Sequence, residues 1–173
     1  MADFDQTFPA PLADVLATEF DYDDGDGMDF EPYTEFQSAR ANASWIQAWT
    51  GNKTLDGAEY RIFGQDGSGG YAMFWLTRPG AELLAQPIVF FGSEGELSVI
   101  ARNFGELTWI LAAGYGPYEA ASYDADLGRS PSEAFTTLAQ KYAPAAKGDG
   151  KELVAAARAE FPTFEADVRK LCG

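Results

Sequence analysis

Four short apolar segments in the middle of the chain constrain its fold most strongly. They are residues 58–63 (AEYRIF), 71–76 (YAMFWL), 88–91 (IVFF) and 97–101 (LSVIA), and glycine-containing stretches separate the first two and the last two. Short runs rich in aromatic and β-branched residues are typical of strands. Because no helical pattern separates them, they predict an antiparallel sheet and not alternating βαβ units. The second run is apolar at nearly every position, which predicts a central strand covered on both faces.

Two helices are predicted before these strands. Leu12, Val15 and Leu16 have helical spacing and indicate a short first helix. A second helix is predicted over residues 38–49, where apolar residues recur every four positions, and it should end at Gly51.

Four helices are predicted after the strands. Their starts are indicated by a capping residue followed three positions later by Glu, or by a proline that interrupts the preceding helix. These signals are Asn103 with Glu106, Ser130 with Glu133 and Pro131 at the first helical position, Asp149 with Glu152, and Pro162 ahead of Phe164, Val168 and Leu171. The helix that begins at Asn103 should end at Gly114.

Length and composition agree with one folded unit. The chain has 173 residues, of which 46% are hydrophobic and 14% aromatic, so it can bury a core. We therefore predict a single α+β domain over residues 1–173: an antiparallel sheet of about four to six strands with helices packed around it. An acidic arm over 1–36 carries the N-terminal helix, and the region 130–172 is helical.

The charge of the chain limits its partners. It has 27 acidic and 12 basic residues, a formal net charge of -15, and the first basic residue is Arg40. Nucleic acids and anionic membranes need cations facing their phosphates, so neither is an expected partner. A basic protein is the expected partner. General acidity that only keeps the protein in solution is the alternative.

Conventional catalytic groups are scarce. The sequence contains no histidine and one cysteine, Cys172, which excludes Ser/His and Cys/His arrangements and an internal disulfide. We expect no enzymatic activity, no cofactor and no bound metal. The sequence has no run of 18 apolar residues and no leader pattern at its start, so we expect a cytoplasmic protein.

The glycine-rich stretch GQDGSGG over residues 64–70 has two interpretations. Its residues Gly67, Gly69 and Ala72 match a loose dinucleotide-binding pattern, G-x-G-x-x-A. That pattern requires the glycines to lead into a helix, whereas here they lead into the predicted strand 71–76. We therefore interpret Gly64, Gly67, Gly69 and Gly70 as a structural turn between two strands, with a nucleotide site as the weaker alternative.

The acidic stretch DYDDGDGMDFEP over residues 21–32 raises the question of calcium. Aligned with an EF-hand loop from Asp21, it has Gly25, Asp26 and Pro32 at positions where the template requires other residues. A solvated acidic loop is the preferred interpretation, and weak cation binding is the alternative.

Two close carboxylate pairs could in principle cleave glycosides. They are Asp24 with Asp26 and Glu94 with Glu96. Such pairs are common in an acidic protein and carry little information, so a carboxylate-dependent hydrolase is a minor alternative.

Several segments together resemble a known family. They are DFEPYTEF (29–36), WIQAWTGN (45–52), FGQDGSGGYAMFWL (63–76), the stretch 86–114 and GYGPYEA (114–120). In this combination they resemble the bacterial branch of the SUKH superfamily. That group is named after a yeast cell-wall-assembly regulator and includes many immunity proteins against bacterial toxins. The resemblance spans about half of the chain.

The resemblance implies a function. It implies a non-enzymatic α+β domain that binds a toxin domain, commonly a nuclease, and blocks its active site; the yeast branch implies an adaptor or regulatory module as the alternative. Charge favours the same kind of partner, since a nuclease carries cations to hold phosphates. The candidate partner-binding residues are Asp21, Asp23, Asp24, Asp26, Asp29, Glu31, Glu94 and Glu96.

Overall fold

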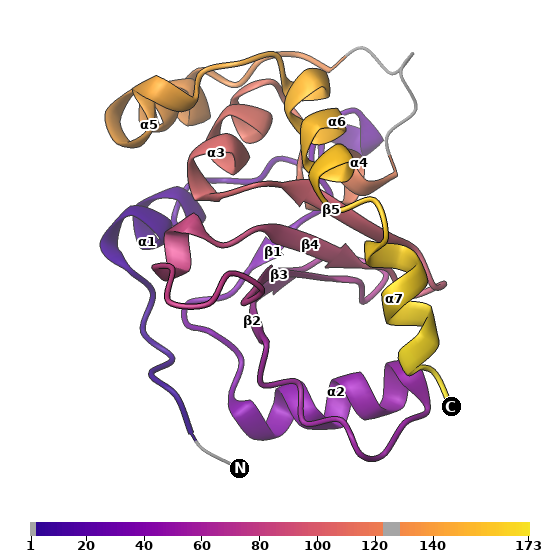
Figure 1. Cartoon of the computed structure of the whole chain (residues 1–173). Coiled ribbons are helices and arrows are strands. Elements are labelled where there is room, and N and C mark those ends of the chain that lie inside the picture. Colours follow the sequence, from indigo (N-terminus) through magenta and orange to yellow (C-terminus); the bar gives the residue numbers. More distant parts are fainter. Residues whose placement is uncertain (1–2, 123–128) are drawn as a thin grey trace.

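A five-stranded antiparallel sheet forms the centre of the protein (Figure 1). The computed structural model describes residues 3–122 and 129–173. The strands lie side by side in chain order, which confirms the predicted antiparallel sheet. They are β1 (Glu31–Pro32), β2 (Tyr60–Gln65), β3 (Tyr71–Trp75), β4 (Ile88–Phe91) and β5 (Leu97–Ala101).

Helices cover both faces of the sheet. In Figure 1, α2 lies below the sheet and α3 and α5 lie above it. The α-helices are α1 (Ala10–Leu16), α2 (Ala39–Thr50), α3 (Phe104–Ala112), α4 (Pro117–Ala121), α5 (Glu133–Tyr142), α6 (Gly150–Glu160) and α7 (Phe164–Leu171). Short 3-10 helices are η1 (Asp23–Gly25), η2 (Leu83–Ala85) and η3 (Pro144–Ala146).

The sheet separates two hydrophobic cores. Along β4, Ile88 and Phe90 enter the core shared with α1, α3, α5 and α6, whereas Val89 and Phe91 enter the core shared with α2 and α7. Successive side chains of a strand point to opposite faces, so a strand that is apolar throughout must be covered on both. β3 lies in the middle of the sheet and its residues 72–74 are fully buried, which confirms the predicted central strand.

Local capping explains where most helices begin and end. The side chain of Ser38 accepts a hydrogen bond from the N–H of Ala41 at 3.3 Å, and Gly51 ends α2 with φ 71°. Asn103 accepts from the N–H of Glu106 at 2.9 Å, and Asp149 caps α6 in the same way. These hydrogen bonds confirm the three predicted helix starts. The starts could be predicted from sequence because a cap depends only on neighbouring residues.

The predicted start of α5 was wrong by two residues. The capping residue is Ser132, whose hydroxyl accepts from the N–H of Phe135 at 3.3 Å. The N–H of Ser132 donates to the carbonyl of Ala112 at 2.8 Å, which ties this point of the chain to the end of α3. Ser130 and Pro131 therefore precede the helix and do not form its cap.

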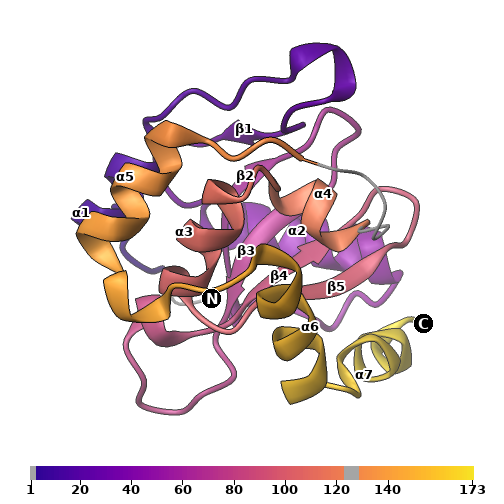
Figure 2. The ribbon, with the colours of Figure 1, turned by 90° about the horizontal axis from the view of Figure 1, so that it is seen from above.

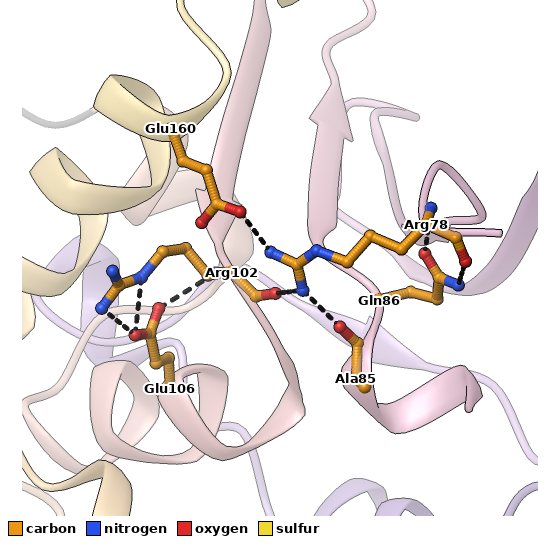
Figure 3. A network of polar contacts seen from close by, with 6 residues as sticks. All are labelled: Arg78, Ala85, Gln86, Arg102, Glu106 and Glu160. Carbon is orange, nitrogen blue, oxygen red and sulfur yellow. Dashed lines mark hydrogen bonds and ion pairs between the residues drawn. The ribbon is translucent and has the colours of Figure 1, made fainter. Parts of the chain in front are cut away.

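Arginines link α6 and α3 to the end of the sheet where β3 and β5 finish (Figure 3). Arg78 donates to the Glu160 carboxylate at 2.6 Å and to the carbonyl of Arg102 at 2.8 Å. The Arg102 side chain donates to Glu106 at 2.8 Å, and Glu106 is buried. Gln86 exchanges two hydrogen bonds with the backbone of Arg78. We call this group the arginine end of the sheet.

Candidate partner-binding surface

Residues 21–28 form a closed acidic loop between α1 and β1. The N–H of Met28 donates to the carbonyl of Asp21 at 2.7 Å, and the N–H of Gly27 donates to the carbonyl of Tyr22 at 3.0 Å. The Asp21 carboxylate also accepts from the N–H of Asp23 at 2.9 Å. A Cβ atom at Gly27 would lie 2.0 Å from the Asp21 carbonyl, so the loop can close only around glycine.

The acidic loop presents its carboxylates to solvent. Asp21, Asp23, Asp24 and Asp26 are all exposed. Among the residues that the structure describes, none donates a hydrogen bond to the carboxylates of the last three. Neighbouring like charges without partners repel one another, so these side chains contribute nothing favourable to the stability of the fold. Their charge is available to a molecule that approaches this surface.

Asp29 and Glu31 have a different environment from the loop aspartates. The Asp29 carboxylate accepts from the N–H of Gly67 at 2.9 Å, and the Glu31 carboxylate accepts from the Gln65 amide at 3.1 Å. Glu31 faces Gln65 in the register of β1 with β2. These two predicted binding residues therefore position the acidic loop against the sheet.

A buried carboxylate supports the end of the loop. Glu119 in α4 is 8% exposed, and its Oε1 accepts from the N–H of Asp29 at 2.8 Å. Its Oε2 is buried and has no hydrogen-bond partner in the part of the chain that the structure describes. Burial raises the pKa of Glu119, because desolvation disfavours the ionised form.

The glycine-rich stretch 64–70 ends β2 and turns the chain into β3. All four N–H groups of residues 67–70 are already hydrogen-bonded, one to Asp29 and three to Asp66. Phosphate cradles depend on free N–H groups that converge on the ligand. None remains in this turn, so the geometry fits a strand connection and gives no support to the nucleotide alternative.

Close packing explains why glycine stands at two of the four positions that were predicted to form the turn. A Cβ atom at Gly70 would lie 2.6 Å from the ring of Phe90, and one at Gly64 would lie 2.3 Å from the ring of Phe30. Gly64 lies within β2, at a bulge in its pairing with β3, whereas Gly70 lies in the turn. Both glycines let an aromatic ring approach the backbone.

Glu94 and Glu96 lie in the turn between β4 and β5, and both are exposed. The N–H of Gly92 donates to the Glu96 carbonyl at 2.8 Å, and the Glu96 carboxylate accepts from the N–H of Glu94 at 3.2 Å. The carbonyl of Gly95 accepts from Arg169 in α7 at 3.3 Å. Glu96 therefore has a role within its own turn, and Glu94 is the freer of the two.

The fold brings the acidic loop and this turn to the same end of the sheet. The turns 66–70 and 92–96 lie at the end where β3 and β5 begin, and the hydroxyls of Ser68 and Ser93 are 3.1 Å apart. Asp29 joins the acidic loop to the first of these turns. Figure 2 shows the acidic segment and the two turns along one side of the molecule. We call this the turn end of the sheet.

A groove of about 560 Å³ lies beneath the acidic loop. Its lining includes acidic residues of the loop, residues 130–132 just before α5, and Met28 and Phe135. Glu19 also lines it and was missing from the predicted site. The sequence gives no signal for this groove, because α5 reaches the loop through a long-range contact between Phe20 and Phe135, whose rings are 4.9 Å apart.

Other site types find little support in the structure. Within residues 3–122 and 129–173 there is no group of three or more acidic or cysteine side chains arranged to hold a metal ion. None of the helices described there is long and apolar enough to cross a membrane. In comparisons with known proteins, the chain matched no family model, no curated protein and no solved structure. The turn end is therefore assessed on its own chemistry.

Proposed function

We propose that the chain is a non-enzymatic, immunity-type binding protein that neutralises a basic toxin domain, most simply a nuclease, in the cytoplasm. One observation carries the proposal. Asp21, Asp23, Asp24 and Asp26 are exposed in a loop that backbone hydrogen bonds close, and the carboxylates of the last three accept no hydrogen bond from the described residues. An acidic loop that costs stability is expected when its charge serves a partner.

Electrostatics gives the proposed mechanism. A nuclease must carry cations that hold phosphates, and an acidic surface can occupy those cations by charge complementarity. The net charge of -15 gives a long-range field that attracts such a partner and speeds association. The groove beside the acidic loop offers apolar floor and carboxylate walls for a basic side chain of the partner.

The family resemblance supports the same proposal independently of charge. The segments that resemble the bacterial SUKH proteins include the glycine-rich turn and the strands that carry the turn end. The resemblance implies an immunity role without catalysis. An adaptor module in a larger assembly would fit the same fold, but no feature of the turn end favours it over a toxin partner.

A toxin-inhibition assay tests the proposal. The probe is a basic nuclease domain sought among the proteins encoded next to the gene for this chain, purified and assayed for its nuclease activity. The unmodified chain should inhibit it near equimolar ratio. A variant with Asp21, Asp23, Asp24 and Asp26 changed to Asn should inhibit at least ~10-fold more weakly, because charged residues at interfaces affect both association rate and affinity.

A matched variant controls for loss of net charge alone. It has four exposed glutamates outside the turn end changed to Gln: Glu35, Glu82, Glu133 and Glu152. This control should inhibit nearly as well as the unmodified chain. Equal loss of inhibition in both variants would contradict a role for the turn end, and no inhibition by the unmodified chain would contradict the immunity proposal itself.

A further inference from the structure

A cleft of about 340 Å³ lies at the outer edge of β5. β5 is the last strand of the sheet, so one of its edges has no neighbouring strand. Three consecutive residues of β5, Leu97, Ser98 and Val99, line the cleft. Because successive side chains of a strand point to opposite faces, a cavity lined by three in a row must lie along the strand edge.

The opposite wall comes from α6, α7 and their connection, which lie beside β5 in Figure 2. Phe161, Pro162 and Phe164 provide its apolar surface. Arg158 of α6 provides a cation in the same lining. The cleft therefore combines strand backbone, aromatic side chains and one positive charge.

Arg158 is held firmly but keeps part of its guanidinium free. Its Nε donates to the hydroxyl of Ser98 at 3.1 Å, and its Nη2 donates to the carbonyls of Ala120 and Ala121 at 3.1 and 3.0 Å. Its Nη1 donates to no residue within 3–122 or 129–173. Three fixed contacts with neutral oxygens orient the group without neutralising its charge.

No carboxylate of the described residues forms an ion pair with Arg158, although acidic residues outnumber basic ones 27 to 12 in the chain. Partial burial lowers the pKa of Arg158, since desolvation disfavours the charged form, but an arginine stays protonated. Arg158 is exposed in the described structure, so its unpaired charge can meet an anion that enters the cleft.

The one acidic residue in the lining, Glu165, already forms an ion pair with Arg169. The Oε1 atom of Glu165 accepts two hydrogen bonds from Arg169, at 3.0 and 2.8 Å. This ion pair balances the charge of Glu165 at the rim. Arg158 is therefore the unbalanced charge in the lining.

We propose that this cleft binds a carboxylate that is attached to an apolar group. The carboxylate pairs with the free Nη1 side of Arg158, and the apolar group packs on Phe161 and Phe164. Two sources share this chemistry: a small organic acid, or the C-terminal residue of a peptide that enters the cleft beside β5. The site is separate from the turn end, so a failure of this proposal would not contradict the proposed immunity function.

Nuclear magnetic resonance titration of the ¹⁵N-labelled full chain tests this site. The probes are 3-phenylpropionate, the tripeptide acetyl-Ala-Val-Phe with a free C-terminus, and the matching amide of each. Salt near 0.15 M screens the negative field of the protein. Both acids should shift the amide signals of residues 97–99 and the Nε–H signal of Arg158 saturably, and both amides should bind at least ~10-fold more weakly.

The two acids also distinguish the sources. If the tripeptide acid binds at least ~10-fold more tightly than 3-phenylpropionate, backbone contacts with the edge of β5 contribute and the ligand is a peptide terminus. Similar affinities indicate a small acid. Equal shifts from acids and amides, shifts that map elsewhere, or no saturable shift would overturn the proposal.

Variants identify the cation responsible. Arg158→Gln should abolish binding of the acids, and Arg158→Lys should weaken it, because an ammonium lacks the planar guanidinium geometry. Arg40→Gln removes the same charge from an exposed position on α2 and should leave binding unchanged. An equal loss in Arg40→Gln would contradict a role for Arg158. If Arg158→Gln fails to fold, the contrast between acid and amide on the unmodified chain decides the question.

Discussion

The two ends of the sheet carry carboxylates in opposite states. At the turn end, Asp23, Asp24 and Asp26 are exposed and accept no hydrogen bond from any residue described by the structure. At the arginine end, Glu106 and Glu160 are both paired with arginine (Figure 3). Glutamates therefore hold the fold together at the arginine end, whereas these three aspartates of the turn end leave their charge at the surface.

This difference shows where the chain uses its few cations. Arg78 and Arg102 lie together at the arginine end, where they connect α6, α3 and the strands. The acidic loop has one cationic contact in the described structure, from Arg129 to the carbonyls of Gly25 and Gly27. That contact binds the loop backbone and leaves the carboxylates unneutralised. The paired charges that stabilise the fold thus lie at the arginine end, and the unpaired surface charges lie in the acidic loop.

Glu106→Gln should have the largest effect on stability. Glu106 is 4% exposed and accepts from the side chain and from the backbone of Arg102. Removing its charge should lower the free energy of unfolding by about 2 to 3 kcal/mol, because a buried carboxylate loses its charge-assisted hydrogen bonds to Arg102. Urea denaturation measures this. Glu165→Gln is the control, since its exposed pair with Arg169 should contribute no more than ~0.5 kcal/mol, and equal costs for the two would contradict the account.

Gly70→Ala should lower the free energy of unfolding by about 1 to 3 kcal/mol. The added Cβ would lie 2.6 Å from the Phe90 ring and 2.9 Å from the Asp66 carboxylate, so packed groups must move. Gly67→Ala is the control, because the atom nearest to its added Cβ is a carboxylate oxygen of Asp29 at 3.1 Å, at the end of a side chain that can shift. Thermal unfolding compares the two, and a variant at Gly70 as stable as the unmodified chain would show that the turn is loosely packed.

The contribution of Glu119 to stability should depend on pH. Its pKa is raised in the folded protein, so the folded state binds this proton more tightly than the unfolded state does. The contribution of Glu119 to the free energy of unfolding therefore rises as pH falls through its raised pKa, and is unfavourable above it. Glu119→Gln removes this dependence and keeps an oxygen for the N–H of Asp29.

Unfolding measured across a pH series checks the sign for Glu119. The stability of Glu119→Gln relative to the unmodified chain should be highest near neutral pH and should decline as the solution is acidified. A difference that stays constant with pH would mean that Glu119 is solvated in the folded protein.

Asp24→Asn and Asp26→Asn should have the smallest effect. Both side chains are exposed and accept no hydrogen bond from the described residues, so each change should alter the free energy of unfolding by less than ~0.5 kcal/mol. A slight gain is expected, because the substitution relieves repulsion within the loop. A loss above ~1 kcal/mol would show that the turn end also holds the fold together, and the comparison between the ends would fail.

Local sequence signals predicted most of the fold. Caps such as Ser38, Asn103 and Asp149 act within three residues, and the strands were visible from short apolar runs between glycines. The start of α5 at Ser132 was missed because a contact with Ala112, distant in sequence, sets it. The two-residue β1 and the short α4 carry too little pattern to be recognised.

The candidate site was predictable only in part. The sequence identified the acidic residues but treated Asp21, Asp29 and Glu31 as equivalent. The structure separates them, because Asp29 and Glu31 meet partners in the sheet that lie more than thirty positions away in the chain. Buried support from Glu119 and the groove beside Phe135 likewise depend on long-range packing, for which one sequence gives no signal.

The association rate between this chain and the proposed basic toxin domain tests the central claim most directly. Stopped-flow measurements at salt concentrations from about 0.05 to 0.5 M would compare the unmodified chain with the variant in which Asp21, Asp23, Asp24 and Asp26 are Asn. The account predicts a rate constant that falls at least ~10-fold with salt for the unmodified chain and much less for the variant. Identical salt dependence in both proteins, or none in either, would contradict it.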